Sequence, residues 1–154
     1  MAKKSKFIGT IGRSVAETQF AFETKESPSK GKPNVIYIVL DDTGFAQLGC
    51  YGSTIHTPNI DRLAKEGLRY NNFHTTAICS ATRASLLTGA NHHSAGVNTT
   101  TEGRTGLPNA QGGIDPHFAT LAEILKEYDY RTMAVGKWHL SGMDERTEAG
   151  PFHN

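Results

Sequence analysis

The chain has 154 residues, of which 37% are hydrophobic and 20% charged, and its formal net charge at pH 7 is +1. This composition is typical of one globular domain, and the small net charge argues against a nucleic-acid-binding or membrane-binding protein. No apolar stretch approaches the ~20 residues of a membrane span. No apolar core follows the basic start, so we predict no signal peptide and a cytoplasmic location. Two cysteines, Cys50 and Cys79, fit a reducing compartment better than a disulfide.

Residues 1–33 are predicted to form an N-terminal arm and linker. The segment begins with the basic run Lys3-Lys4-Ser5-Lys6, and its apolar residues follow no helical or strand period. It ends in residues 27–33, which are rich in Ser, Pro, Gly and Lys and are typical of a linker. A basic leader can bind anionic surfaces, but a solvated, mobile terminus is the commoner case. The globular part is therefore predicted over residues 34–154.

The first predicted element of the globular part is a strand over residues 35–40, an unbroken β-prone apolar run typical of a parallel sheet covered on both faces. It ends at the acidic pair Asp41-Asp42. Thr57-Pro58 then predicts a helix start, with the proline at the first helical position. One apolar face follows, made of Ile60, Leu63, Ala64 and Leu68.

The second half predicts two more helices and a second strand. A short helix follows Cys79 and ends near Gly89, and residues 98–117 are predicted to be a long surface loop. Thr120 and Glu123 form a capping-box pattern at the next helix, and residues 131–135 are predicted to be a parallel strand. The predicted fold class is therefore α/β, a mostly parallel sheet flanked by helices, with functional groups at the carboxyl ends of strands.

Asp41 and Asp42 repel each other if both are ionised at the end of a buried strand. A hard divalent cation with oxygen ligands, calcium or magnesium, would relieve that repulsion. The alternative is that Asp41 caps a turn and Asp42 faces water. Both interpretations fit the residues alone.

Cys79 and Arg83 also allow two interpretations. No second cysteine stands at zinc-ligand spacing, which argues against a zinc site, and a small buried core cysteine is the simplest assignment. On a helix that begins near Ser80, however, Arg83 lies above the same face as Cys79. A guanidinium at that place needs an anionic or strongly polar neighbour, which favours a site that faces an anion.

Three motifs in this order resemble the sulfatase family: Asp41-Asp42, Cys79-x-x-x-Arg83 with Leu86-Leu87-Thr88-Gly89, and Gly136-Lys137-Trp138-His139-Leu140. The likeness covers roughly residues 33–154 and is similar to the N-terminal part of a bacterial arylsulfatase. It implies an alkaline-phosphatase-like α/β fold and hydrolysis of a small sulfate ester. The net charge and the absence of a long apolar stretch separately predict no nucleic-acid or membrane partner.

The resemblance implies that a maturation enzyme oxidises Cys79 to formylglycine. One hydroxyl of the hydrated aldehyde attacks the ester sulfur, and the other later expels sulfate. Asp41, Asp42 and residue 79 would bind the cation, Ca²⁺ with Mg²⁺ as the alternative. Arg83 would bind the diol, Lys137 would neutralise sulfate charge, and His139 would help to deprotonate the diol.

The sequence departs from the family in three respects. Ala81 replaces the usual Pro, and Asp129 replaces a Gly at a helix-to-strand turn. Sulfatases supply an Asp-Asn pair and another Lys and His from positions beyond Asn154. We therefore expect the N-terminal piece of a catalytic domain with little activity alone. The rivals are a phosphonate or phosphodiester hydrolase of the same superfamily and a non-catalytic remnant.

Overall fold

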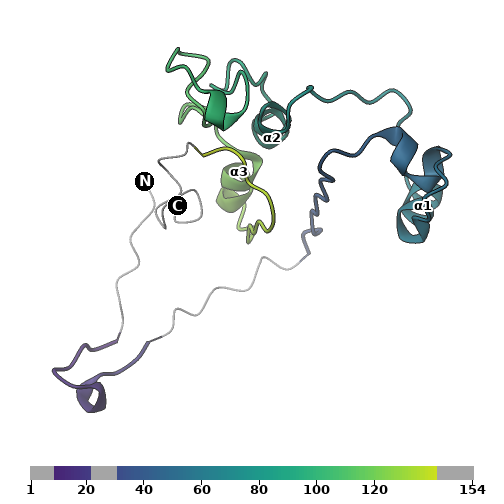
Figure 1. The fold of residues 1–154 in the computed structure, drawn as a ribbon. Helices are drawn as coiled ribbons and strands as arrows, with labels where there is room; N and C mark the ends of the chain where they lie inside the picture. Colours follow the sequence, from purple (N-terminus) through teal and green to yellow (C-terminus); the bar gives the residue numbers. More distant parts are fainter. Residues whose placement is uncertain (1–8, 22–30, 142–154) are drawn as a thin grey trace. The chain divides into compact units, whose positions relative to one another are not determined.

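The computed structural model describes residues 9–21 and 31–141 (Figure 1). The chain divides into two units, Met1–Lys32 and Pro33–Asn154. In the first unit, the described residues contain the short 3-10 helix η1 (Val15–Glu17). An antiparallel bridge joins Thr10 and Gln19 through N···O distances of 3.1 and 2.9 Å. The basic run of residues 3–6 lies outside the described residues.

The second unit contains every helix that the sequence predicts. These are α1 (Pro58–Glu66), α2 (Cys79–Thr88) and α3 (Leu121–Glu127), with the 3-10 turns η2 (Phe45–Gln47), η3 (Gly49–Tyr51) and η4 (Thr101–Gly103). None of the helices in the described ranges has the length and hydropathy to cross a bilayer.

The helix ends follow the local sequence signals. Pro58 occupies the first turn of α1, and Gly89 ends α2 with φ of +69°. The capping box of α3 is present: the Glu123 amide donates to Thr120 Oγ1 at 3.3 Å, and the Thr120 amide donates to Glu123 Oε2 at 2.7 Å. These signals act within one helical turn, which explains why they could be predicted from sequence.

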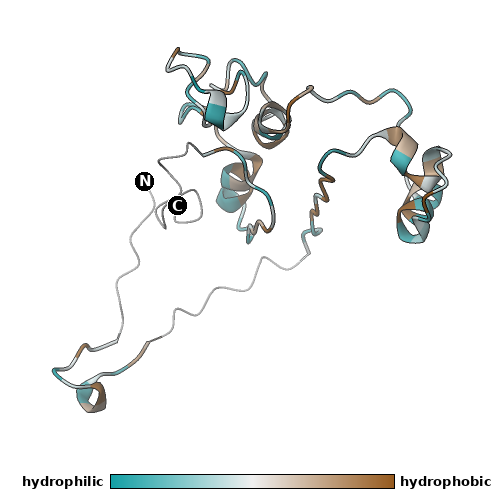
Figure 2. Cartoon of the chain, viewed as in Figure 1, coloured by the Kyte–Doolittle hydropathy of each residue, from teal (hydrophilic) through white to brown (hydrophobic). Residues whose placement is uncertain are grey.

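The two predicted strands are not observed in the described residues. Residues 35–40 and 131–135 have no assigned strand, and they are exposed: Ile36 is 78% and Val135 104% accessible. The run of residues 35–40 is one of the apolar stretches in Figure 2. A parallel strand depends on neighbouring strands for its hydrogen bonds, and no described segment supplies them. The parallel sheet therefore stays a prediction.

The apolar face predicted for the first helix is also not buried in the structure. Leu63 is 60% exposed, and Leu68 lies beyond the end of α1 and is 87% exposed. Residue spacing predicted the helix correctly, but the burial of that face depends on a partner surface that the described residues do not provide.

A small core connects three segments that are far apart in the sequence. Ala84 of α2, Val97 and Leu140 form it, and Leu87, Ile114 and Trp138 pack against it. The segment predicted as a long surface loop, residues 98–117, folds back on the residues around Val97 through amide-to-carbonyl hydrogen bonds that include Gln111 to Gly96 at 2.9 Å and Asp115 to Ala95 at 2.9 Å. The core therefore fixes α2, this loop and residues 138–140 together.

Candidate active site

Cys79 is the first residue of α2 and is half-buried. Ser80, Ala81 and Ala84 of the same helix are buried and anchor it. Thr76 and Thr82 join their hydroxyl groups at 2.6 Å, and this contact fixes the chain entering the helix. Because the amino end of a helix carries a partial positive charge, the position of Cys79 favours an anion nearby.

His139 lies against Cys79 although the two are 60 residues apart. Its Nδ1 is 3.1 Å from Cys79 Sγ, and its Nε2 is 3.1 Å from Glu102 Oε2. The backbone of His139 has φ of +58°, a left-handed conformation that is uncommon outside glycine. Backbone strain of this kind is concentrated at functional sites, and here it accompanies a ring whose two nitrogens are both engaged.

Arg83 and Lys137 meet at Asp41. Lys137 Nζ donates to Asp41 Oδ2 at 2.7 Å, and Arg83 Nη2 lies 3.4 Å from Asp41 Oδ1. Arg83 Nη1 also donates to the backbone carbonyl of Lys137. The Nε of Arg83 is buried without a hydrogen-bond partner. The guanidinium therefore joins Asp41, which follows residues 35–40, to Lys137, which lies shortly after residues 131–135.

The charges of this group reinforce one another. The hydrogen bond from Lys137, helped by Arg83, holds the pKa of Asp41 below its ordinary value. The hydrogen bond with Asp41 raises the pKa of Lys137, and the nearby Cys79 side chain adds to that effect. At neutral pH Asp41 is therefore ionised and Lys137 protonated, so that a cationic ammonium lies beside both Asp41 and Cys79.

The described residues do not by themselves form the predicted cation site. They contain no group of three or more His, Cys, Asp or Glu side chains placed to hold a metal ion. Both Asp41 oxygens already accept from cationic groups, so Lys137 and Arg83 relieve the charge repulsion here. Asp42 follows with φ of +51°. Since calcium takes 6–8 oxygen ligands, the cation set of Asp41, Asp42 and residue 79 stays a prediction.

Two further residues of the loop after α2 are His92 and Glu102. His92 donates from Nδ1 to the carbonyl of Val97 at 2.7 Å, and the centroid of its ring lies 4.3 Å from that of His93. Glu102 was not predicted from the sequence. It stands in a loop rich in Gly, Thr and Asn, where no residue pattern marks it.

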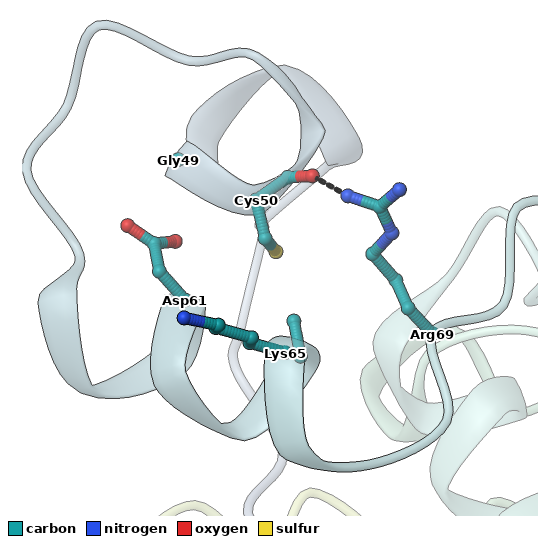
Figure 3. Close-up of a pocket in the computed structure, with 6 residues that line it drawn as sticks. Gly49, Cys50, Asp61, Lys65 and Arg69 are labelled. Atoms are coloured by element: carbon teal, nitrogen blue, oxygen red, sulfur yellow. Dashed lines mark hydrogen bonds between the residues drawn. The ribbon is translucent and has the colours of Figure 1, made fainter.

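A separate pocket lies at α1 and contains none of the predicted site residues (Figure 3). Gly49, Cys50, Asp61, Ala64, Lys65 and Arg69 line it. Arg69 Nη1 donates to the carbonyl of Cys50, which ties the segment after α1 to η3. Cys50 thus belongs to this packing contact, whereas Cys79 belongs to the group around His139 and Lys137.

Comparison with known proteins places residues 33–154 in the sulfatase family model. The chain is 45% identical over 129 residues to an uncharacterized sulfatase of Schizosaccharomyces pombe, covering 79% of this chain and 23% of that protein. It is 41% identical over 111 residues to human arylsulfatase D, covering 70% and 19%. It is 42% identical over 113 residues to an N-acetylgalactosamine-6-O-sulfatase of Bacteroides thetaiotaomicron, covering 71% and 21%.

The chain thus spans about a fifth of the length of the curated relatives it matches. The family match covers the segment that carries Asp41, Cys79, Arg83, Lys137 and His139, and the structure brings these five side chains into one group. The chain belongs to the sulfatase family.

Proposed function

We propose that the full-length protein hydrolyses sulfate esters at the group of side chains around Cys79. The observation that carries this proposal is the 3.1 Å contact between Cys79 Sγ and His139 Nδ1, with the Lys137 ammonium beside Cys79. A nucleophile at a helix amino end, a base within hydrogen-bond reach and a cation for a developing negative charge are what transfer of an anionic group requires.

The side chains would divide the work as follows. Lys137 Nζ binds a sulfate oxygen and offsets charge that develops on it. Arg83 holds Asp41 and the Lys137 carbonyl in place, so that the ammonium faces residue 79. His139 Nδ1 accepts a proton from residue 79. As hydrated formylglycine, residue 79 would supply one hydroxyl that attacks sulfur and displaces the ester alcohol, and a second that loses its proton and expels sulfate as the aldehyde re-forms.

The finer parts of the proposal come from the family. A maturation enzyme would convert Cys79, and the sulfatase α/β fold would add a mostly parallel sheet in which residues 35–40 and 131–135 become strands. A divalent cation, Ca²⁺ or Mg²⁺, would bind hard oxygen ligands that include Asp41 and Asp42, together with ligands outside the described residues. Terbium luminescence of the full-length protein, with Asp42→Asn as the variant, tests this cation: equal affinity in both proteins contradicts it.

The activity is tested with the full-length protein made in a host that has the maturation enzyme. Mass spectrometry of the peptide that contains residue 79 should show loss of the thiol, and 4-nitrophenyl sulfate should be turned over. Cys79→Ala should abolish turnover, whereas Cys50→Ala, the matched control in the separate pocket, should keep it. Faster turnover of a phenyl phosphonate than of the sulfate would contradict the sulfatase assignment in favour of the phosphonate hydrolase.

A further inference from the structure

Both ring nitrogens of His139 lie within hydrogen-bond distance of another side chain, and one of these partners, Glu102, has no role in the proposed function. Nδ1 faces Cys79 Sγ, and Nε2 faces Glu102 Oε2, each at 3.1 Å. The side chain of His139 is 18% exposed and that of Glu102 is 42% exposed. The ring is therefore mostly enclosed between the helix amino end and the loop that carries Glu102.

The Glu102 contact determines which nitrogen carries the proton of the neutral ring. An ionised carboxylate can only accept hydrogen bonds, so Nε2 must donate to it. A neutral imidazole has one N–H, and Nδ1 is then left with a lone pair that faces residue 79. Without Glu102 the ring could carry its proton on Nδ1, and the nitrogen beside residue 79 could not accept a proton.

Glu102 comes from a fixed part of the loop. It is the middle residue of η4, directly after Thr101, which is 2% exposed. The same loop contributes Val97 to the core that also contains Ala84 of α2 and Leu140, the residue after His139. One small core therefore sets the positions of the helix that carries Cys79, the loop that carries Glu102 and the backbone of His139.

We propose that Glu102 is a positioning residue that holds His139 in its Nε2–H tautomer and directs Nδ1 at residue 79. The inference rests on the proposed function, since it assigns a purpose to the orientation of a base. Carboxylates that orient a functional histidine in this way typically contribute 10- to 100-fold when they act behind a metal ligand. We expect an effect of about that size on turnover.

The first test does not depend on catalysis. Long-range ¹H–¹⁵N spectra of the full-length protein with ¹⁵N-labelled histidine report the ring tautomer, and His139→Gln identifies the signal. The Cys79→Ser form is used at a pH at which the spectra show a neutral ring, because a serine hydroxyl stays protonated and does not draw the ring proton to Nδ1 as a thiolate would. We expect the Nε2–H tautomer in the wild type and a mixture in Glu102→Ala. A wild-type ring protonated on Nδ1, or an unchanged tautomer in the variant, would overturn the proposal.

The second test is kinetic and uses the matured enzyme with 4-nitrophenyl sulfate. Glu102→Ala should lower kcat by about 10- to 100-fold while KM stays within about twofold, because the base acts on the chemical step. Glu102→Gln keeps an acceptor oxygen and should retain more activity. Glu127→Gln, an exposed glutamate at the end of α3, is the control. Equal kcat for Glu102→Ala and this control would refute the role.

The two tests separate the possible failures. If the matured wild type does not hydrolyse the sulfate, the proposed function is wrong, and the tautomer spectra still decide whether Glu102 orients His139. If Glu102→Ala does not fold, Glu102→Leu, which is closer in size and has no acceptor oxygen, replaces it in both tests. In that case a detectable Nδ1–H population with lowered kcat supports the proposal, and spectra and kinetics like those of the wild type overturn it.

Discussion

Replacing Gly49 with alanine should destabilise the junction between η3 and α1, because the space for a β-carbon is already occupied. A Cβ built at Gly49 would lie 2.6 Å from Asp61 Oδ2 and 2.9 Å from Oδ1. That carboxylate cannot simply move away. Its Oδ1 accepts from Thr57 Oγ1 at 2.9 Å, and Thr57 Oγ1 accepts from the Gly49 amide at 2.8 Å.

The expected magnitude follows from these contacts. Overpacking by one methyl group costs about 1–3 kcal/mol, and breaking the Thr57–Asp61 hydrogen bond costs about 1 kcal/mol. If Asp61 moves, the overlap is relieved but the hydrogen bond is broken, so the two costs do not add in full. We therefore expect the free energy of unfolding to fall by about 2 kcal/mol in total. For a cooperative unit of about 150–250 residues that lowers Tm by about 4–8 °C, and the shift becomes smaller as the unit becomes larger.

The assay is urea and thermal unfolding of the full-length protein in a double-mutant cycle. Asp61→Ala removes the carboxylate that meets the new methyl group, so Gly49→Ala combined with Asp61→Ala should destabilise by about 1 kcal/mol less than the sum of the single changes. Gly44→Ala is the control, because its Cβ would meet only Gln47 Oε1 at 4.0 Å. Equal unfolding midpoints for Gly49→Ala and Gly44→Ala, or strict additivity in the cycle, would refute this reasoning.

Three further predictions concern the site and the ends of α3. Lys137→Met should lower kcat for 4-nitrophenyl sulfate by about 10²-fold; a loss no larger than that of Lys126→Met would contradict its role. Thr120→Ala should destabilise by about 1 kcal/mol. Hydrogen bonds from Thr120 lower the pKa of Glu123. This stabilisation is therefore present above pH 4.5 and is lost as the pH falls through the lower folded pKa. If urea titrations give the same difference in unfolding free energy between wild type and Thr120→Ala in acid as at neutral pH, the reasoning is contradicted. Asp129 has φ of +60°. Its replacement by Gly should raise the free energy of unfolding by about 0.5–1 kcal/mol, and a lower Tm would disprove the strain.

The sequence predicted the helices well because their signals are local. Pro58, Gly89 and the Thr120–Glu123 pair each act within one turn of the helix they delimit. The strands are different, since an apolar run becomes a strand only when neighbours accept and donate its hydrogen bonds. Residues 35–40 and 131–135 have the composition of strands, but their pairing depends on chain segments that no local pattern describes.

The candidate site shows the same division. The spacing of Cys79 and Arg83 on one helix predicted that the two side chains share a face, and the family motifs predicted that Lys137 and His139 belong with them. The contact of Asp41 with Lys137 follows from tertiary structure, as does that of Glu102 with His139. Glu102 could not be predicted, because an acidic residue in a polar loop is usually solvated and only the folded loop brings it to the ring.

The core of Ala84, Val97 and Leu140 has a consequence for genetic screens. Val97 is 1% exposed and is not among the residues proposed to act on substrate, yet its packing holds the separate chain segments that meet at the ring of His139. A shortened side chain at Val97 would let those segments drift by fractions of an ångström. A search for variants with lost turnover would therefore recover Val97 beside the reactive residues, and only protein yield and melting behaviour would tell the two kinds of lesion apart.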